Sequence, residues 1–250
     1  AVFDRLRFMG ADLNSIPQAL REQVGLWLER YGDNDHVDQL AKLVACSEFA
    51  GAVVLREKEW FLENIDGFME PPGIEALDTF VNDDATPEQA KSLLRRFRNR
   101  YMLHVLWREV FGLADLDETL TALSRLADRM LAVATRCAER ALEPRFGVVR
   151  DDQGDKVPLV ILGMGKLGGL ELNFSSDIDV IFLYPRNGKT DGRKCADAQE
   201  YFGRLSQQVF AMLDEKTGDG FVFRMDTRLR PFGASGPPVV SFSALESYLL

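Results

Sequence analysis

The spacing of hydrophobic residues changes once along the chain, close to residue 146. Before that point apolar residues recur every three or four positions, which is the period of an amphipathic α-helix. From Val157 onward the pattern becomes short apolar runs separated by glycine-rich or polar turns, which is typical of strands that alternate with short helices. The pattern predicts a helical domain over residues 1–145 and an α+β domain over residues 146–250.

Capping and stop signals set the boundaries of the predicted helices. Thr86, Pro87 and Gln89 form the strongest start signal, because proline suits the first helical turn and a threonine followed by a glutamine can form a capping box. Pro144 is expected to end a long helix because it lacks a backbone N–H. Together with the apolar spacing, these signals predict helices over residues 15–31, 36–65, 86–111, 115–143 and 198–213, and a further helix start at Ser243.

The stretch Val160–Tyr184 organises the second domain. It is predicted to form a buried central strand, a glycine-rich turn, a short helix and a second strand that opens with Asp177 and Asp179. Alternate residues of a strand project to the same face, so both carboxylates are predicted to project together, with apolar side chains on the opposite face. Paired carboxylates repel unless a proton or a cation lies between them, and carboxylates are preferred ligands of magnesium. A metal site for phosphoryl or nucleotidyl transfer is one interpretation, and a solvent-exposed strand start is the other.

A third acid lies in the alternating segment Phe221–Arg230, which predicts another strand. One face of this strand carries Asp226 among arginines at positions 224, 228 and 230. Such a face fits a third metal ligand flanked by guanidinium groups that clamp phosphate oxygens. A ladder of cross-strand salt bridges is the structural alternative.

The turn Gly163–Gly168 matches G-x-G-x-x-G, a pattern found in dinucleotide-binding folds. That fold needs an acid at the end of its second strand, where this chain has residues 183–185 (Leu-Tyr-Pro), and a Walker A loop also fails because Lys166 is followed by leucine. The turn still suits a phosphate cradle, since backbone N–H groups at a helix start attract anions and a lysine there is unfavourable without one. Either residues 165–166 or residues 168–169 would contact the phosphate.

Composition narrows the function classes. Hydrophobic residues make up 46% and charged residues 28% of the 250 residues, as in globular proteins, and the net charge of −9 argues against a nucleic-acid partner, which needs a basic surface. No apolar run is long enough to span a bilayer. Three widely spaced cysteines fit a reducing cytoplasm, and the two histidines, His36 and His104, are interpreted as structural. The arginines between positions 95 and 100 are interpreted as a solvent-exposed helix face rather than a substrate or interdomain site.

Two segments, Gly163–Pro185 and Asp219–Phe242, carry motifs in a specific order: G-K-L-G-G, E-L, S-D-I-D, R-L-R-P and S-G-P. In these motifs the chain resembles the nucleotidyltransferase module of the bifunctional glutamine synthetase adenylyltransferase/adenylyl-removing family, whose members carry two such modules in a longer polypeptide. Residues 173–176 and 230–233 are more similar to the N-terminal, adenylyl-removing copy. The resemblance implies a polymerase-beta-like mixed sheet for residues 146–250 and a fragment truncated at its C-terminus.

The resemblance also implies a function. The expected reaction is magnesium-dependent phosphorolysis, in which inorganic phosphate removes AMP from a tyrosine of adenylylated glutamine synthetase and leaves as ADP. Two alternatives stay open: ATP-dependent adenylylation of glutamine synthetase, and a catalytically silent module that docks on it. The implied partners are glutamine synthetase and the PII signalling protein in the cytoplasm, with no nucleic acid and no membrane.

The resemblance assigns residues to this chemistry as well. The expected metal-binding and catalytic residues are Asp177, Asp179 and Asp226. The expected nucleotide- or phosphate-binding residues are Gly165, Lys166, Gly168, Ser176, Arg228 and Arg230. A tyrosine leaving group has a pKa near 10, so its phosphodiester is activated, and phosphate needs no histidine base to attack it.

Overall fold

The computed structural model describes residues 36–250 and, before them, residues 18, 22, 25 and 26. The helix predicted over residues 15–31 therefore lies outside the described residues, apart from these single positions. The chain divides into two compact units. We call residues 1–72 with 99–116 the helical unit, and residues 73–98 with 117–250 the sheet unit.

The helical unit packs its helices around an aromatic core. Its described elements are α3 (Val37–Cys46), α4 (Glu48–Arg56), α5 (Lys58–Asn64), the 3-10 helix η2 (Ile65–Met69) and the C-terminal part of α7 (Pro87–Val110). Phe68 is one of the buried residues at the centre of this core. The rings of Phe61 and Trp107 meet it at centroid distances of 5.8 and 6.0 Å, and the ring of His104 stacks on it at 4.1 Å. None of the predicted site residues belongs to this unit.

Helix α7 begins where the sequence predicts. The Thr86 N–H donates to Gln89 Oε1 at 2.9 Å and the Gln89 N–H donates to Thr86 Oγ1 at 3.3 Å, which is a reciprocal capping box. The helix ends at Val110, and Gly112 follows with a φ of +68°. Both ends of the predicted helix are confirmed.

The arginines of α7 do not form the solvent-exposed face that the sequence suggests. Arg96 is exposed, but Arg95 is fully buried because the backbone supplies partners for its guanidinium group. It donates to the carbonyl oxygens of Lys91, Met212, Glu215 and Gly220. Burial lowers the pKa of Arg95 from its ordinary value. The side chain ties α7 to the C-terminal end of α10 (Ala198–Asp214) and to the turn that follows it.

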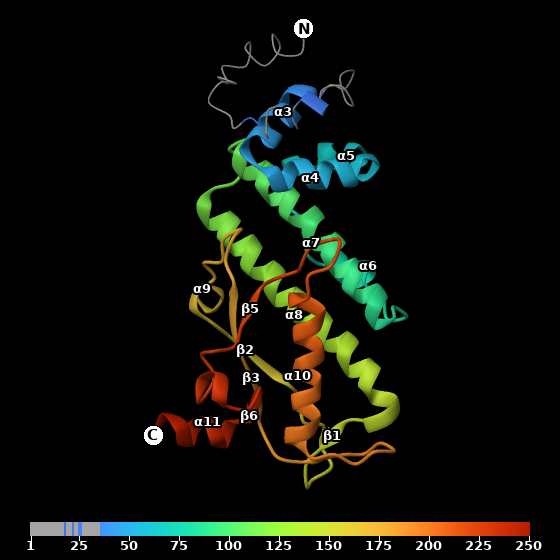
Figure 1. The fold of residues 1–250 in the computed structure, drawn as a ribbon, viewed down its shortest axis with the longest axis vertical. Coiled ribbons are helices and arrows are strands. Elements are labelled where there is room, and N and C mark those ends of the chain that lie inside the picture. Colours follow the sequence, from blue (N-terminus) through green and yellow to red (C-terminus); the bar gives the residue numbers. More distant parts are fainter. Residues whose placement is uncertain (1–17, 19–21, 23–24, 27–35) are drawn as a thin grey trace. The chain divides into compact units, whose positions relative to one another are not determined.

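The sheet unit combines helices with a mixed four-stranded sheet (Figure 1). Its helices are α6 (Ala76–Phe80), the N-terminal part of α7, α8 (Leu116–Phe146), α9 (Gly165–Gly168), α10, the 3-10 helix η3 (Gly233–Ser235) and α11 (Phe242–Leu249). Its strands are β1 (Val149–Arg150), β2 (Val160–Met164), β3 (Ile178–Tyr184), β4 (Lys189–Thr190), β5 (Met225–Asp226) and β6 (Val239–Ser241). β1 and β4 form a separate two-stranded ribbon. The predicted α+β class with a mixed sheet is confirmed.

β3 is the central strand of the sheet. β2 pairs with it antiparallel along one edge, with Met164 opposite Asp179, and β5 and β6 pair with it parallel along the other edge. The prediction that the apolar run before the glycine-rich turn forms the central strand is therefore wrong. β2 lies at an edge with mostly half-buried side chains, because it has β3 as its one partner among the described strands. The antiparallel pairing also excludes a dinucleotide-binding βαβ unit, whose strands run parallel.

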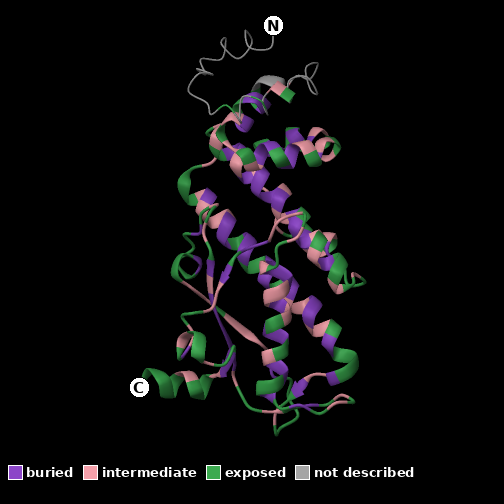
Figure 2. Ribbon diagram, in the orientation of Figure 1, coloured by how far each residue is buried: buried purple, intermediate pink, exposed green. Residues whose placement is uncertain are grey.

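One face of the sheet packs against helices (Figure 2). It carries alternate residues of β3 that are buried as predicted: Ile178, Val180 and Phe182. Tyr184 continues this series and stacks on Phe202 of α10, with the ring centroids 5.3 Å apart. Ile161 of β2, in register with Phe182, faces a groove lined by α8. Helices α8 and α10 thus supply the core beneath this face.

The opposite face carries an acid at one end of β3 and apolar side chains at the other. Asp179 lies on this face, and Ile181 and Leu183 follow at alternate positions. These two residues pack with Val240 of β6 in a small apolar cluster, against which Leu245 of α11 also packs. We call this side of the sheet the acid face, and α11 lies on it.

The strand predicted over residues 221–230 is shorter than expected. Only Met225–Asp226 pairs with β3. The chain then turns, and the Arg230 N–H donates to the carbonyl oxygen of Thr227 at 3.2 Å. Arg228 and Arg230 therefore do not line one face of an extended strand.

Two predicted helix boundaries are also corrected. Pro144 does not end α8, which runs on to Phe146 and stops before Gly147, a residue with a φ of +67° that suits a helix end. Helix α11 starts at Phe242 and is capped by Ser241 rather than by Ser243. The Ser241 hydroxyl accepts the N–H of Ala244 at 3.1 Å, which makes it the N-cap.

The domain boundary predicted at residue 145 follows the change from helices to strands. Packing divides the chain differently, since α8 belongs to the sheet unit. The predicted boundary separates types of secondary structure, whereas the two units are separated by packing. The boundary at residue 145 therefore stays a prediction.

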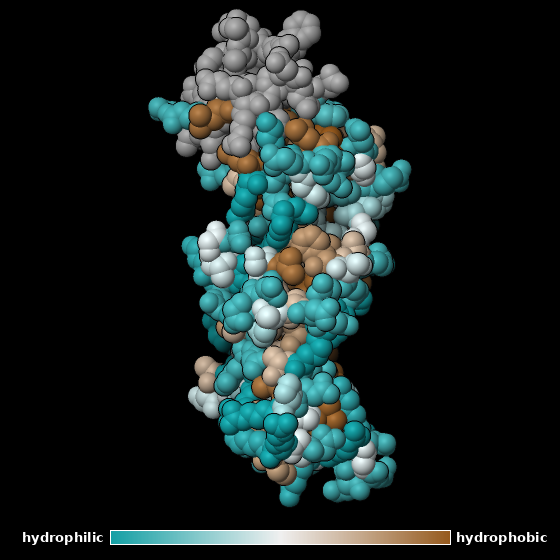
Figure 3. Space-filling view, turned by 90° about the vertical axis from the view of Figure 1, so that its right-hand side faces the viewer, coloured by the Kyte–Doolittle hydropathy of each residue, from teal (hydrophilic) through white to brown (hydrophobic). Residues whose placement is uncertain are grey.

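The surface is dominated by polar groups on the side shown in Figure 3, where hydrophobic side chains form scattered patches. In the part of the chain that the structure describes, no helix has the length and apolar character needed to cross a membrane.

Replacing Arg95 tests the contacts of the buried guanidinium group. We expect Arg95→Met to lower the free energy of unfolding by about 3 kcal/mol or more, because it leaves several buried carbonyl oxygens without donors. Arg96→Met, on the exposed side of the same helix, is the matched control and should change stability by less than about 1 kcal/mol. Urea unfolding measures both variants, and equal effects would contradict a structural role for Arg95.

The stability of the protein is expected to depend on the protonation of His104. Burial lowers the pKa of His104 from 6.5 to about 4, and its Nε2 lies 2.8 Å from the carbonyl oxygen of Glu70. The unfolded chain binds this proton near pH 6.5, whereas the folded chain binds it near pH 4. The stability that neutral His104 contributes to the folded protein is therefore complete above pH 6.5 and is lost as the pH falls from about 6.5 to about 4.

Urea midpoints measured between pH 4 and pH 8 test this linkage. His104→Phe keeps a ring that can stack on Phe68 but cannot be protonated. Both proteins should lose stability on acidification, because their carboxyl groups become protonated. The variant should lose less than the wild type, because it has no imidazole at position 104 to be protonated. Parallel pH profiles for the two proteins would contradict the prediction.

Candidate active site

The register between β3 and β5 brings two of the predicted acids together. Asp179 of β3 and Asp226 of β5 are directly opposite each other in the parallel pair, so both side chains project to the acid face from strands about 4.8 Å apart. Asp177 comes two positions before Asp179 and is exposed, while Ile178 between them is fully buried on the other side. The alternation predicted from the sequence is confirmed, and all three acids belong to one face.

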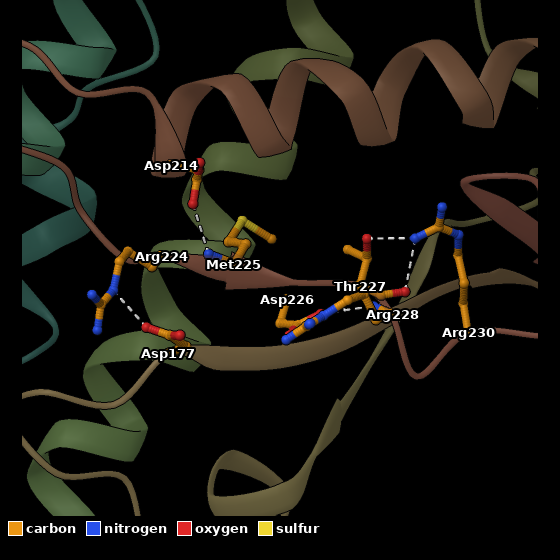
Figure 4. A network of polar contacts seen from close by, with 8 residues as sticks. All are labelled: Asp177, Asp214, Arg224, Met225, Asp226, Thr227, Arg228 and Arg230. Atoms are coloured by element: carbon orange, nitrogen blue, oxygen red, sulfur yellow. Dashed lines mark hydrogen bonds and ion pairs between the residues drawn. The ribbon is translucent and has the colours of Figure 1, made fainter. Parts of the chain in front are cut away.

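The end of α10 holds β5 in place. The Met225 N–H donates to the side chain of Asp214, the last residue of α10, at 2.8 Å (Figure 4). The preceding carbonyl, that of Arg224, accepts the N–H of Ile178 at 2.9 Å. Asp226 therefore takes its position from α10 on one side and from β3 on the other.

Arginine side chains pair with the acids (Figure 4). Arg224 Nε lies 2.5 Å from a carboxylate oxygen of Asp177, and Arg228 Nε donates to the carboxylate of Asp226 at 2.8 Å. The backbone N–H of Arg228 also donates to Asp226 Oδ1 at 2.8 Å, which the turn after β5 permits. The two arginine side chains are 59% and 80% exposed, so solvent screens both pairs and their partners can change.

Arg228 shifts the ionisation of Asp226. Hydrogen bonds from its side chain and then from its backbone N–H lower the pKa of Asp226 below its ordinary value. Asp226 in turn raises the pKa of Arg228, and the charges of Asp179 and Asp177 add to this shift. Asp226 is thus ionised at neutral pH, and Arg228 lies within electrostatic reach of all three acids.

Close packing explains two glycines of the turn after β2. Gly165 has a φ of +52°, and a Cβ atom there would lie 2.7 Å from Oδ2 of Asp179. A Cβ atom at Gly168 would lie 2.7 Å from the carbonyl oxygen of Gly163. Glycine is what allows the turn to approach Asp179 and β2 this closely. The glycine pattern therefore has a packing role at the acid face, whether or not it also contacts phosphate.

The other predicted phosphate-binding residues lie in different surroundings. Lys166 is exposed on α9. Ser176 Oγ donates to Asn173 Oδ1 at 2.7 Å in the turn before β3. Arg230 turns into its own loop, where Nη1 donates to the carbonyl oxygen of Thr227 at 2.8 Å. Ser176 and Arg230 thus have structural contacts that the sequence does not reveal.

The donor set suits a hard divalent cation. Carboxylates from adjacent strands on one face are oxygen ligands of the kind that magnesium prefers. The described His, Cys, Asp and Glu residues do not form a group of three or more that could hold a metal ion, and Asp177 and Asp226 each pair with an arginine instead. Exposed pairs of this kind contribute little to stability, so a cation can compete for the carboxylates. The three acids therefore match magnesium in donor type and share one face, but they would have to gather more closely than they do here to hold one ion together.

Asp214 is a supporting residue that the sequence analysis missed, because nothing in its local pattern predicts a contact with a residue beyond the next turn. Arg224 belongs to the predicted arginine face, but its pairing with Asp177 follows only from the register of β5 against β3. The pair of Arg224 with Asp177 thus joins segments far apart in the sequence, whereas Asp214 and Met225 are joined by the fold of the turn between α10 and β5.

Comparison with known proteins finds relatives over most of the chain. The family described as "Glutamate-ammonia ligase adenylyltransferase" matches residues 37–250. A bifunctional glutamine synthetase adenylyltransferase/adenylyl-removing enzyme of Shewanella loihica is 40% identical over 225 residues, which cover 86% of this chain and 23% of the relative. The enzyme of the same description from Thioalkalivibrio sulfidiphilus is 41% identical over 94% of this chain and 26% of the relative. The enzyme from Chromobacterium violaceum is 43% identical over 76% of this chain and 20% of the relative. The chain spans about a quarter of the length of these relatives. The resemblance seen in the motifs is confirmed.

The close approach of the glycine turn to Asp179 can be tested by adding a methyl group. Gly165→Ala should lower the free energy of unfolding by about 2 kcal/mol, because alanine is strained at a positive φ and its Cβ meets the carboxylate. Gly169→Ala is the control in the same turn, since a Cβ there has no neighbour closer than 3.6 Å. Thermal unfolding of both variants gives the comparison, and equal melting temperatures would show that the turn does not constrain Asp179.

Proposed function

The chain belongs to the glutamate-ammonia ligase adenylyltransferase family, and on that premise we propose that it removes AMP from adenylylated glutamine synthetase by phosphorolysis. The observation that carries this proposal is the acid face, where Asp179 and Asp226 lie side by side and Asp177 is next to them. Inorganic phosphate is the second substrate, and ADP and unmodified glutamine synthetase are the products. The proposal includes a PII signalling protein as the regulatory partner of the whole protein.

The reaction balances without an added oxidant or reductant. An oxygen of inorganic phosphate forms a bond to the phosphorus of the AMP group, and the bond from that phosphorus to the tyrosine oxygen breaks. The bonding pair leaves with the tyrosine oxygen, which then takes up a proton. A leaving group with a pKa near 10 departs readily, so the main task of the site is to position the reactants and to balance their negative charge.

The acids and arginines of this chain divide that task. Asp177, Asp179 and Asp226 would hold magnesium, which when bound supplies charge neutralisation at the phosphate oxygens. Arg228 is exposed beside Asp226, so its guanidinium group can bind phosphate oxygens when it releases the carboxylate. The proposed phosphate contacts also include residues of the glycine turn and its surroundings: Gly165, Lys166, Gly168, Ser176 and Arg230.

The place of the histidines supports phosphorolysis over ATP-dependent adenylylation. The chain has two histidines, His36 and His104, and both belong to the helical unit rather than to the unit with the acid face. Adenylylation uses a tyrosine hydroxyl as nucleophile, which is weak at neutral pH without a general base. Inorganic phosphate is already an anion at neutral pH and needs no such base.

Release of ADP from adenylylated glutamine synthetase tests the proposal. With magnesium and inorganic phosphate, the wild-type protein should release ADP, and Asp177→Asn should reduce the rate by about 100-fold or more through loss of a charge at the reacting phosphates. Asp152→Asn removes an exposed acid outside the acid face and should leave the rate unchanged.

Each result decides between the candidate reactions. ADP release that requires phosphate and is lost in Asp177→Asn supports phosphorolysis at the acid face. Incorporation of AMP from ATP into unmodified glutamine synthetase would move the assignment to the adenylylating reaction. Equal loss of activity in Asp152→Asn would show that the effect of Asp177 is not specific to the site.

A further inference from the structure

The segment Thr227–Pro238 leaves the edge of the sheet and returns to it close by. β5 ends at Asp226, opposite Asp179, and β6 begins at Val239, opposite Phe182. These two positions on β3 are about 10 Å apart, at about 3.3 Å per residue. The segment is therefore a compact surface loop whose ends are close together, a type of loop that is frequently functional. We call it the omega loop, and it starts beside the acids.

Arg230 holds the omega loop in shape from within. Its Nη1 donates to the carbonyl oxygen and the hydroxyl of Thr227, at 2.8 and 2.7 Å. Its Nε and Nη2 lie 3.4 Å from the carbonyl oxygens of Gly236 and Ala234. One guanidinium group thus connects the start of the loop with its end, so the loop is constrained although most of it is neither helix nor strand.

Phe232 lies in the middle of the omega loop in an uncommon conformation. Its φ of 62° and ψ of 13° are in the left-handed region, which bulky side chains rarely adopt. The residue is 67% exposed, so burial does not offset the strain. Strained residues persist only where their surroundings enforce them, and they gather at binding and catalytic sites. The loop therefore presents an aromatic ring to solvent at a cost in stability.

Tyr248 shows on which side of the sheet Phe232 lies. The ring centroids of Phe232 and Tyr248 are 5.0 Å apart. Tyr248 belongs to α11, whose Leu245 packs against the apolar cluster of the acid face. Phe232 is therefore on the same side of the sheet as Asp179.

We propose that Phe232 is a base-binding residue: the purine ring of an adenine nucleotide whose phosphates lie at the acids stacks on its exposed phenyl ring. A nucleobase stacks on an aromatic side chain through its flat face and needs no polar partner there. The omega loop begins at Asp226 and carries Arg228, so the same segment supplies a phosphate contact near its start and the stacking ring at its middle. The inference rests on the proposed function, because it takes the acid face as the place of the phosphates.

Binding measurements with two ligands separate the base from the phosphates. The dissociation constants of ATP and of inorganic triphosphate, both with magnesium, are measured for the wild-type protein and its variants. Phe232→Gly should weaken ATP binding by about 5- to 100-fold and leave triphosphate binding unchanged, because triphosphate has no base. Phe232→Tyr keeps an aromatic ring and should keep the affinity for ATP. Leu229→Ala removes another exposed apolar side chain of the same loop and should change neither constant.

Glycine is chosen at position 232 because it adopts a positive φ without strain. Phe232→Gly should therefore fold, with a melting temperature equal to or above that of the wild type, so a loss of ATP affinity cannot be attributed to unfolding. A lower melting temperature together with weaker binding of both ligands would overturn the inference, since it would give Phe232 a role in the loop rather than in base binding.

The remaining outcomes separate this inference from the proposed function. If ATP affinity is unchanged in Phe232→Gly but falls in Asp177→Asn, the stacking role is wrong and the acid face still binds the phosphates. If Phe232→Gly changes only the KM for adenylylated glutamine synthetase, the ring contacts the protein substrate, and the base-binding role is again wrong. If the wild-type protein binds neither ATP nor triphosphate, the base-binding role fails, whereas the proposed function is decided separately by the release of ADP from adenylylated glutamine synthetase.

Discussion

Parallel pairing of β5 with β3 is the constraint on which the acid face depends. Asp179 and Asp226 are far apart in the sequence, and they meet because their strands are in register. A slip of one residue in this pair would turn Asp226 to the opposite, apolar face of the sheet. The pair is only two residues long, so its own hydrogen bonds hold the register weakly, and the neighbouring structure has to fix it.

That support comes from the end of α10 and, behind it, from a buried arginine. The side chain of Asp214 binds the backbone N–H of Met225, while Arg95 of α7 binds the carbonyl oxygens at the end of α10. The last carbonyl groups of a helix lack intrahelical donors and carry negative partial charge, so a guanidinium group is suited to this place. The position of Asp226 is thereby fixed through α10 by a residue in another helix of the sheet unit, which makes no contact with the acids themselves.

The sequence predicted the features that depend on neighbours along the chain. The start of α7 at Thr86 and the alternation around Asp177 and Asp179 follow from local rules, and the structure confirms both. Burial of Arg95 could not be predicted, because three of its four acceptors come from residues beyond 210. The sequence also assigned the central strand to a continuous apolar run, although β3 takes that place. Apolar content does not show which strand has partners on both edges.

The arginines at the acid face give the site two ways to balance its charge. Three carboxylates on one face repel each other, and Arg224 and Arg228 offset this repulsion by pairing with Asp177 and Asp226. Both arginines are exposed, so they can leave their carboxylates without opening a buried pair. In the proposed reaction a divalent cation would take over the carboxylates, and the released guanidinium groups would then be available to phosphate oxygens. The same side chains would thus stabilise the acid face before the substrate binds and bind the substrate afterwards.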